Sequence, residues 1–234
     1  MNIEQFIQAL KEKGIELTEK QLNQFELYYK ELVEWNEKMN LTNITEKEDV
    51  YLKHFYDSLT LAFDYPLSNQ SIADIGAGAG FPSIPLKIVY PDLKVTIVDS
   101  LNKRITFLNH LVKVLELENV NAIAARAEEY AINHREQFDL VSARAVARLN
   151  VLDELCLPLV RVGGMFISLK GNQGVIEVEE AKNGILKLGG KVIEVHEFEL
   201  PNHDHRVNVL IQKEKSTPKQ YPRNFGKIKK SPLK

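Results

Sequence analysis

The sequence predicts an α/β fold in which helices cover both faces of a doubly wound, mostly parallel sheet of seven strands. From Ile72 to about residue 213, short apolar runs alternate with segments of helical periodicity. A glycine-rich loop follows the first apolar run, as it does where a buried parallel strand turns into a helix. Before residue 65 the periodicity is helical throughout, so a helical extension precedes the sheet.

The first two helices are defined by apolar spacing and by residues that start or stop a helix. Apolar side chains recur at helical spacing from Ile3 to Leu10, and Gly14 ends this pattern. Thr18 is a candidate N-cap for a longer second helix, because its hydroxyl can accept a hydrogen bond from a free amide of the first turn. Apolar residues continue at helical spacing as far as Trp35.

A third helix is expected over about residues 46–63. Thr45 stands at the N-cap position, and Glu48 stands at the capping-box position three residues later. Pro66 and the polar residues up to Ser71 then mark a connection. Residues 1–65 are therefore assigned to the helical extension.

The sheet region, residues 66–213, is assigned from the alternating pattern. We expect strands at 72–75, 94–98, about 121–125, 138–142, 165–169, 191–198 and 206–213. Helices fit between them at about 83–90, 102–116, 127–134, 146–160 and 175–188. The last two strands are joined by too few residues for a crossover helix, so this pair is antiparallel. The predicted sheet is Rossmann-like, with one reversed strand at its end.

Composition is ordinary for a soluble globular protein, with 44% hydrophobic and 26% charged residues in 234. No apolar run approaches the ~20 residues that span a bilayer, and the N-terminus lacks a secretory signal. One cysteine excludes an internal disulfide. We therefore expect a cytoplasmic protein without membrane contact, as a monomer. His203 and His205 lack further ligands at zinc-like spacing, so no metal site is expected.

The C-terminus differs from the rest of the chain in charge. Residues 213–234 carry a net charge of +7, whereas the whole protein carries −2. A basic tail on an acidic body is often a nucleic-acid contact, but it can also be a solvated terminus that keeps the protein in solution. Residues 214–234 are expected to form a flexible basic tail, and both interpretations stay open.

The glycine-rich loop predicts a nucleoside cofactor. The first strand ends at Asp74, and Gly76, Gly78 and Gly80 follow at alternate positions. Such a loop lets the backbone approach a ligand closely, because side chains are absent. The second strand ends at Asp99, 23 residues after the first glycine, which is about the interval at which an acid returns to a ribose.

The loop fits S-adenosylmethionine better than a dinucleotide. A dinucleotide fingerprint has a third glycine where this chain has Phe81, and Pro82 removes an amide that a pyrophosphate would need. S-adenosylmethionine contains no phosphate. We therefore expect the loop backbone, including Ala77, to hold this methyl donor. A nicotinamide-dependent oxidoreductase is the less favoured alternative.

Further cofactor contacts are expected at three strand ends. Asp74 can hydrogen-bond the loop or reach the donor's ammonium group through water, or it can merely fix the turn. Asp99 and Ser100 end the second strand, where Asp99 is expected at the ribose. Ala127 and Glu128 follow the third strand, where backbone amides can read an adenine edge. Glu128 can equally complement a helix dipole in the first turn.

Arg144 ends the fourth strand, where substrate meets cofactor in open α/β sheets. Methyltransferases that act on an exocyclic amine often carry an Asp/Asn-Pro-Pro-aromatic stretch here, and this chain has none. A ring nitrogen such as guanine N7 already presents a lone pair, so its methylation needs alignment rather than a base. Arg144 can donate to guanine O6 or to a phosphate. An Arg–carboxylate pair in the wall of the sheet is the alternative.

These motifs together resemble one family over nearly the whole chain, the bacterial small-subunit ribosomal RNA guanine-N7 methyltransferases, also called glucose-inhibited division protein B. The residues that carry the resemblance are Trp35-Asn36 with Asn40-Leu41-Thr42, His54 with Asp57-Ser58, Asp74 to Pro82, Asp99-Ser100 through Lys103-Arg104, Ser142-Ala143-Arg144-Ala145 and Leu169-Lys170-Gly171.

The resemblance implies the activity and the roles of individual residues. It implies methylation of guanine N7 at one position in the 530-loop region of 16S rRNA, with S-adenosylmethionine as donor. It also implies cofactor contacts at Gly76, Phe81, Asp99, the Ala127-Glu128 backbone and Arg144, and a polar, basic RNA rim of Asn40, His54, Lys103, Arg104, Arg126, Arg144 and Lys170. A ribosome-assembly factor that binds RNA without turnover is the competing function.

Overall fold

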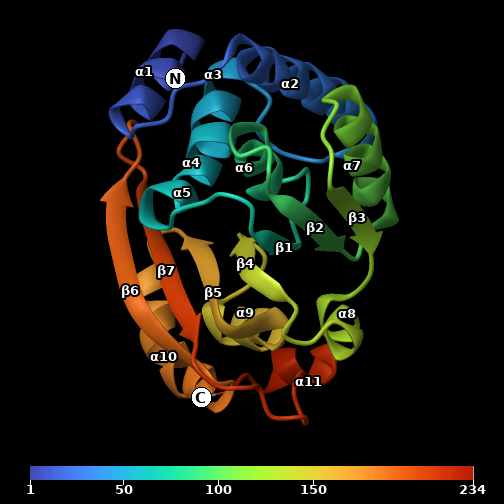
Figure 1. The fold of residues 1–234 in the computed structure, drawn as a ribbon, viewed down its shortest axis with the longest axis vertical. Helices are drawn as coiled ribbons and strands as arrows, with labels where there is room; N and C mark the ends of the chain where they lie inside the picture. Colours follow the sequence, from blue (N-terminus) through green and yellow to red (C-terminus); the bar gives the residue numbers. More distant parts are fainter. Residues whose placement is uncertain (234) are drawn as a thin grey trace.

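The computed structural model describes residues 1–233, which form one seven-stranded mixed sheet between two layers of helices (Figure 1). The strands are β1 (Ser71–Ile75), β2 (Lys94–Asp99), β3 (Val120–Ala124), β4 (Phe138–Arg144), β5 (Val160–Lys170), β6 (Gly190–Glu199) and β7 (His205–Lys213). Their order in the sheet is β3-β2-β1-β4-β5-β7-β6. Strands β1 to β5 are parallel, and β7 pairs antiparallel with both β5 and β6. The predicted fold class is therefore confirmed.

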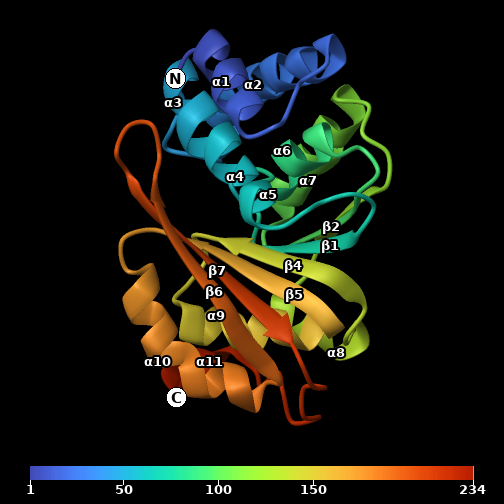
Figure 2. The ribbon, with the colours of Figure 1, turned by 60° about the vertical axis from the view of Figure 1, so that its left-hand side comes forward.

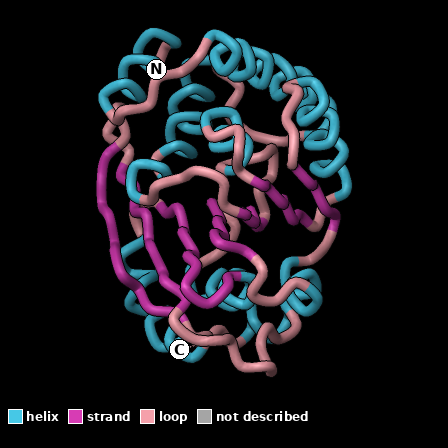
Figure 3. The backbone as a smooth tube through the Cα atoms, in the orientation of Figure 1, coloured by secondary structure: helices cyan, strands magenta, loops and turns pink. Residues whose placement is uncertain are grey.

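The helices divide between the two faces of the sheet (Figure 2). One layer contains α1 (Ile3–Glu12), α2 (Glu19–Met39), α3 (Lys47–Val50), α4 (Asp57–Leu59), α5 (Leu61–Asp64), α6 (Ser83–Val89) and α7 (Asn102–Val114). The other contains α8 (Ala127–Asn133), α9 (Leu149–Cys156), α10 (Gly174–Lys187) and α11 (Phe225–Lys230). Short helical segments η1 (Tyr51–Tyr56) and η2 (Leu157–Leu159) complete the set. Figure 3 shows helices on both sides of the strands, with one edge of the sheet at the margin of the molecule.

Alternation along each strand produces two separate hydrophobic cores. In β1, Ile72 packs in the core under the N-terminal helices, whereas its neighbour Ala73 packs in the core under α8 to α11. Successive side chains of a strand point to opposite faces, so a buried sheet supplies both layers. The N-terminal helices thus share a core with the sheet, contributing fully buried residues such as Phe25 and Phe55.

The second N-terminal helix starts as predicted, but the third does not. The Thr18 hydroxyl accepts a hydrogen bond from the Gln21 amide, and the Gln21 side chain accepts one from the Thr18 amide. By contrast, Thr45 is not a cap: α3 follows Glu46, whose side chain makes no capping hydrogen bond. The predicted helix over 46–63 is also interrupted, because η1 is a wider, π-helical turn and Thr60 separates α4 from α5.

The chain after β4 and the C-terminus also differ from the prediction. Helix α9 begins at Leu149 rather than near 146, because Ala145 has a positive φ of 54° and residues 145–148 form a loop. The tail was expected to be flexible, yet residues 214–233 pack against the domain, where α11 contributes the fully buried Ile228. The few apolar residues of this segment stand among many charged and polar ones, so the sequence gave little signal for this packing. No helix within residues 1–233 is long and apolar enough to cross a membrane.

Candidate active site

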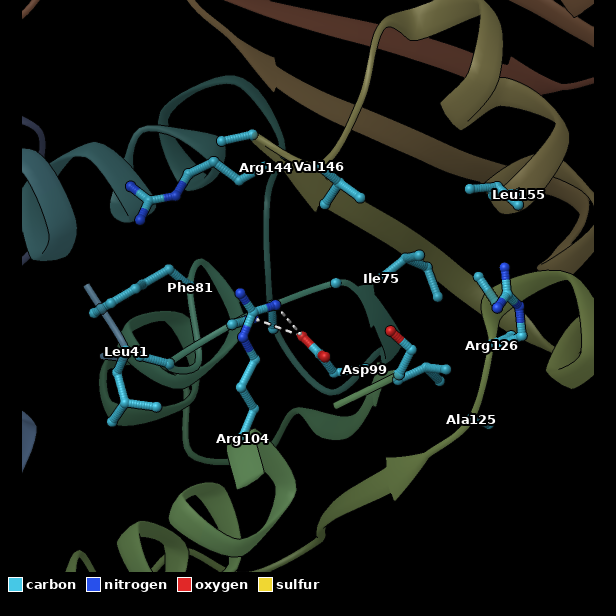
Figure 4. A pocket seen from close by; sticks show the side chains of 18 of the residues that line it. Leu41, Ile75, Phe81, Asp99, Arg104, Ala125, Arg126, Arg144, Val146 and Leu155 are labelled. Atoms are coloured by element: carbon cyan, nitrogen blue, oxygen red, sulfur yellow. Dashed lines mark hydrogen bonds and ion pairs between the residues drawn. The ribbon is translucent and has the colours of Figure 1, made fainter. Parts of the chain in front are cut away.

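A pocket of about 450 Å³ opens at the carboxyl ends of β1 to β4, where the strand order reverses next to β1 (Figure 4). Ligands of open α/β sheets bind in the crevice at this switch point. The lining consists of Ile75–Ala79, Phe81, Val98–Ser100, Ala125–Glu128 and Arg144–Val146, with Leu41, Thr42, His54, Arg104, Leu155 and Phe225. The sequence-predicted loop, β2 end, β3 end and β4 end therefore meet in one cavity.

The three loop glycines differ in how much space surrounds them. All have positive φ, at 71° for Gly76, 61° for Gly78 and 105° for Gly80. A Cβ at Gly80 would lie 2.8 Å from the Tyr28 hydroxyl, and one at Gly76 would lie 2.7 Å from the side chain of Val146. At Gly78, no described atom lies within 4 Å of that position. Only Gly78 therefore leaves open space into which a ligand can approach the backbone.

Asp74 and Gly80 were expected to contact the cofactor, but both lie behind the pocket wall. Asp74 is fully buried, and its Oδ2 accepts a hydrogen bond of 3.0 Å from the Ser83 amide. Its Oδ1 has no hydrogen-bond partner within residues 1–233. Burial raises the pKa of Asp74 to about 7, because the charged carboxylate loses its hydration. These two residues support the loop from beneath.

Asp99 connects the loop to the following helix. Its Oδ2 accepts hydrogen bonds from the Gly78 amide at 3.2 Å and from Arg104 Nη1 at 3.0 Å (Figure 4). Its Oδ1 accepts one from the Leu101 amide at 3.0 Å. The side chain is only 2% exposed, but it lines the pocket, and Oδ1, which accepts one hydrogen bond, can accept a second. Arg104, expected in the RNA rim, is thus a partner of the predicted ribose ligand.

The end of β3 forms the opposite end of the pocket from Phe81 and Arg144 (Figure 4). Arg126 Nε donates a 2.7 Å hydrogen bond to Glu128, so this pair holds the turn at the start of α8. The Arg126 guanidinium carbon lies 5.2 Å from the centre of the Phe225 ring. Sequence reasoning placed Arg126 with RNA and did not single out Phe225, which enters from the C-terminal segment.

Arg144 is held by the N-terminal extension. Its Nη1 donates to the Lys53 carbonyl at 3.0 Å and to Asp57 Oδ2 at 3.2 Å, and its Nη2 lies 3.1 Å from His54 Nδ1. Asp57 Oδ1 accepts a second hydrogen bond of 3.0 Å, from Arg206 Nε of β7. The carboxylate pair considered from the sequence is therefore present, and Arg144 still lines the pocket with its own side chain.

His54 is neutral in this arrangement. A guanidinium can only donate hydrogen bonds, so His54 Nδ1 accepts from Arg144 and the ring proton is on Nε2, 2.8 Å from the Thr42 hydroxyl. Burial and the nearby guanidinium lower the pKa of His54 to about 3. The ring stacks on Phe81 at 4.3 Å between centres and an interplanar angle of 16°. Phe81 stacks in turn on Tyr28, at 5.4 Å and 13°.

A second pocket of about 520 Å³ adjoins the first and shares four lining residues with it. The shared residues are His54, Arg144, Ala145 and Val146. Cationic side chains surround this second pocket, but carboxylates pair with several of them: Lys170 Nζ lies 2.8 Å from Glu177, and Arg148 pairs with Glu180. Arg206, which also lines it, was not identified from the sequence because β7 offers no local motif.

The residues predicted to form the RNA rim divide between the two pocket linings and the surface beside them. His54, Arg104, Arg126 and Arg144 line the first pocket, and Lys170 lines the second. Asn40 and Lys103 lie outside both linings. Asn40 ends α2 with a φ of 49°, and Lys103 Nζ donates a 2.7 Å hydrogen bond to the carbonyl of Met39 beside it. Within residues 1–233, no three metal-ligating side chains form a cluster.

The sequence is similar to proteins that methylate ribosomal RNA. A family profile described as rRNA small subunit methyltransferase G matches residues 21–206. The chain is 58% identical over 237 residues to the protein named Ribosomal RNA small subunit methyltransferase G from Oceanobacillus iheyensis, covering 100% of each. It is 59% identical over 236 residues to the protein of that name from Staphylococcus epidermidis, covering 100% of this chain and 99% of the relative.

Solved structures share the fold at low sequence identity. The crystal structure of M. jannaschii TYW2 in complex with AdoMet has a TM-score of 0.52 and 19% identity, covering 62% of this chain and 69% of that one. At this level of identity the likeness shows a common fold and carries no residue roles.

Proposed function

Because the chain belongs to the rRNA small subunit methyltransferase G family, we propose that it transfers the methyl group of S-adenosylmethionine to N7 of a guanine in the 530-loop region of 16S ribosomal RNA. The resemblance indicated by the sequence motifs is confirmed by the family profile and by the full-length relatives. The substrate is therefore small-subunit rRNA. The target loop, the residue roles, a monomeric state and a cytoplasmic location are our proposals.

The two adjoining pockets carry this proposal. The first pocket suits a nucleoside, since it combines the open approach at Gly78, the buried carboxylate of Asp99 and the apolar walls of Ile75, Val98 and Leu155. The second pocket is rimmed by cations, as a site for an RNA nucleotide requires. Residues His54 and Arg144 border both cavities, so donor and guanine would meet beside them.

The proposed transfer needs alignment and no general base. When bound, S-adenosylmethionine supplies an electrophilic methyl group, and guanine N7 can attack it without first losing a proton. His54 is not available as a base, because its Nδ1 already accepts from Arg144 and its Nε2 carries the ring proton. This agrees with chemistry in which the protein mainly positions the two reactants.

Arg144 is the residue proposed to orient the guanine. Three of its N–H groups are used by Lys53, Asp57 and His54, which leaves two of the five donors of a guanidinium. Those donors can bind guanine O6 or a phosphate oxygen at the boundary between the pockets. The Asp57 carboxylate, shared with Arg206, fixes the direction in which Arg144 extends.

The test is to incubate the protein with radiolabelled S-adenosylmethionine and small subunits from a strain that lacks this gene. Label should enter 16S rRNA, and strand cleavage specific for 7-methylguanosine should map it to the 530-loop region. Asp99→Ala should weaken donor binding far more than RNA binding. Label at an exocyclic amine, or no transfer to any form of the subunit or its RNA, would contradict the proposal.

A further inference from the structure

Phe225 reaches the first pocket from the far end of the chain. It is the first residue of α11, which lies beside α8 and α9 in Figure 1, and it lines the cavity together with residues of β1 to β4. The family profile ends at residue 206, so the segment that carries Phe225 lies outside the part of the chain that the profile describes. Relatives such as the Oceanobacillus iheyensis protein nevertheless match this chain over its whole length.

The segment of residues 214–233 is anchored by a buried ion pair. Arg223 Nη2 lies 2.6 Å from Glu154 Oε2, Arg223 Nε lies 2.8 Å from Glu154 Oε1, and the Arg223 amide donates to the same oxygen at 2.8 Å. Glu154 is fully buried on α9, and a bidentate pair of this kind fixes both position and direction. Phe225 therefore lies only two residues after Arg223, the residue at which the segment is fixed to α9.

Two further contacts hold the segment on either side of this anchor. Before it, Arg135 donates to the carbonyl of Thr217 at 2.6 Å and also to that of Tyr221. After it, Ile228 is fully buried in the core beneath α8 to α11. The lysines of α11, Lys227, Lys229 and Lys230, are exposed. The helix thus has an apolar side in the domain and a basic side in solvent.

The Phe225 ring contributes to the pocket end formed after β3. It lies 5.2 Å from the Arg126 guanidinium carbon, and Leu155 lines the same cavity. Figure 4 shows Arg126 and Leu155 together at the end away from Phe81 and Arg144. Ala127 and Glu128, which the sequence places beside the adenine, line this end of the pocket. An aromatic ring next to an arginine offers a flat surface on which a purine can pack.

We propose that the C-terminal segment is a wall of the methyl-donor pocket and that Phe225 contacts the adenine of the donor. The proposal rests on the assignment of the first pocket to S-adenosylmethionine made above. It gives the basic segment a function in cofactor binding that is separate from any contact of its lysines with RNA.

The test is the affinity of purified variants for S-adenosylmethionine, S-adenosylhomocysteine and adenosine, measured by isothermal titration calorimetry. Phe225→Ala should weaken all three by roughly tenfold, because each contains the adenine, and a lost aromatic contact is worth about one factor of ten. Phe225→Tyr should bind like the original protein. Lys227→Ala, an exposed change in the same helix, is the matched control and should leave all three affinities unchanged.

Comparison with Asp99→Ala distinguishes a failure of the Phe225 proposal from a failure of the assignment of the first pocket to the methyl donor. If Asp99→Ala weakens donor binding and Phe225→Ala does not, the wall proposal is wrong and the pocket assignment stands. If neither change alters donor binding, the pocket assignment itself is wrong. Circular dichroism melting of each variant identifies unfolding; should Phe225→Ala unfold, Phe225→Leu provides the test, with weakened adenosine binding expected and unchanged binding contradicting the proposal.

Discussion

At the residue scale, two buried ionisable groups near the active site have pKa values that are shifted in opposite ways. His54 is a base whose pKa falls to about 3, and Asp74 is an acid whose pKa rises to about 7. Burial is the largest cause of both shifts, because it penalises the charged form of each group. Both side chains are consequently neutral through mildly acidic solution, and the charge of Arg144 acts on both of them.

His54 should therefore show no titration between pH 5 and 8. A folded pKa below the ordinary value of 6.5 means that the folded state binds fewer protons, so stability is complete above pH 6.5 and is lost as pH falls toward 3. At pH 5 the loss is about 2 kcal/mol. NMR of the ring protons measures this directly, with exposed His203 as a comparison in the same sample. A His54 midpoint near pH 6.5 would contradict the tautomer assigned here.

Asp74 makes folding stability depend on pH in the opposite direction from His54. Its folded pKa is raised, so its contribution to stability is complete below its ordinary value near 3.8 and is lost as pH rises toward 7, by about 4 kcal/mol. The contributions of His54 and Asp74 therefore largely offset one another between pH 5 and 7. Asp74→Asn, which keeps an acceptor for the Ser83 amide, should unmask the His54 slope, with stability rising over this range.

Urea unfolding at several pH values checks the Asp74 prediction. His54→Gln provides the reciprocal control, because it leaves Asp74 in place and should make stability fall as pH rises. Parallel pH profiles for the two variants would show that the groups are not shifted in opposite directions. Donor affinity of Asp74→Asn should change little, since the carboxyl lies behind the pocket wall.

At the element scale, Gly80 of the glycine loop is required by packing, whereas Gly78 leaves space for a ligand. Gly80→Ala should destabilise the fold by about 1–3 kcal/mol, because the new Cβ meets Tyr28 and Ile84 at a positive φ. Gly78→Ala should cost about 1 kcal/mol of stability from its backbone alone but reduce donor affinity at least tenfold. Melting temperatures and calorimetry together distinguish these outcomes. If both changes reduced donor affinity equally, Gly78 would not be the position at which the ligand approaches the backbone.

The elements that the sequence predicted well are those with a local signal. Thr18 faces Gln21 at the spacing of a capping box, and that start was correct. Thr45 and Glu48 have the same spacing, yet that helix starts one residue later without a side-chain cap. The Ser58 and Thr60 hydroxyls donate back to the carbonyls of His54 and Asp57, which competes with regular helix geometry there. Such competition is decided by tertiary packing.

The candidate site was predictable where it lies on strand ends and unpredictable where it joins distant segments. Gly78, Asp99 and Arg144 each end or follow a parallel strand, so topology alone brings them together. Arg206 and Phe225 arrive from β7 and α11, and no spacing in the sequence indicates that β7 lies beside β5 or that α11 returns to α8. Asp74 and Gly80 were assigned to the cofactor because burial is not readable from a loop motif.

At the scale of the whole molecule, the excess positive charge of the C-terminus lies on the outer side of a packed helix. Changing Lys227, Lys229 and Lys230 to glutamine should weaken RNA binding and reduce the slope of log affinity against log salt by about 2–3, because fewer counterions are released. Fluorescence anisotropy with a 16S rRNA fragment over a salt series measures the slope. The control is to change Lys187 of α10 and Lys191 of β6 to glutamine, which is the same chemical change at another place. An identical change in slope would mean that RNA binding responds to net charge alone and not to the position of the α11 lysines.

The wall shared by the two pockets has a consequence for how the two substrates influence each other. His54 and Arg144 border both cavities, and each is locked to the other and to the extension that precedes the sheet. A nucleotide that draws the guanidinium toward itself must alter the surroundings of the methyl donor, and by thermodynamic reciprocity the donor must alter the affinity for the nucleotide by the same factor. Binding of either molecule would then change the affinity for the other, so the concentration of the methyl donor would set how tightly the enzyme holds the ribosomal subunit.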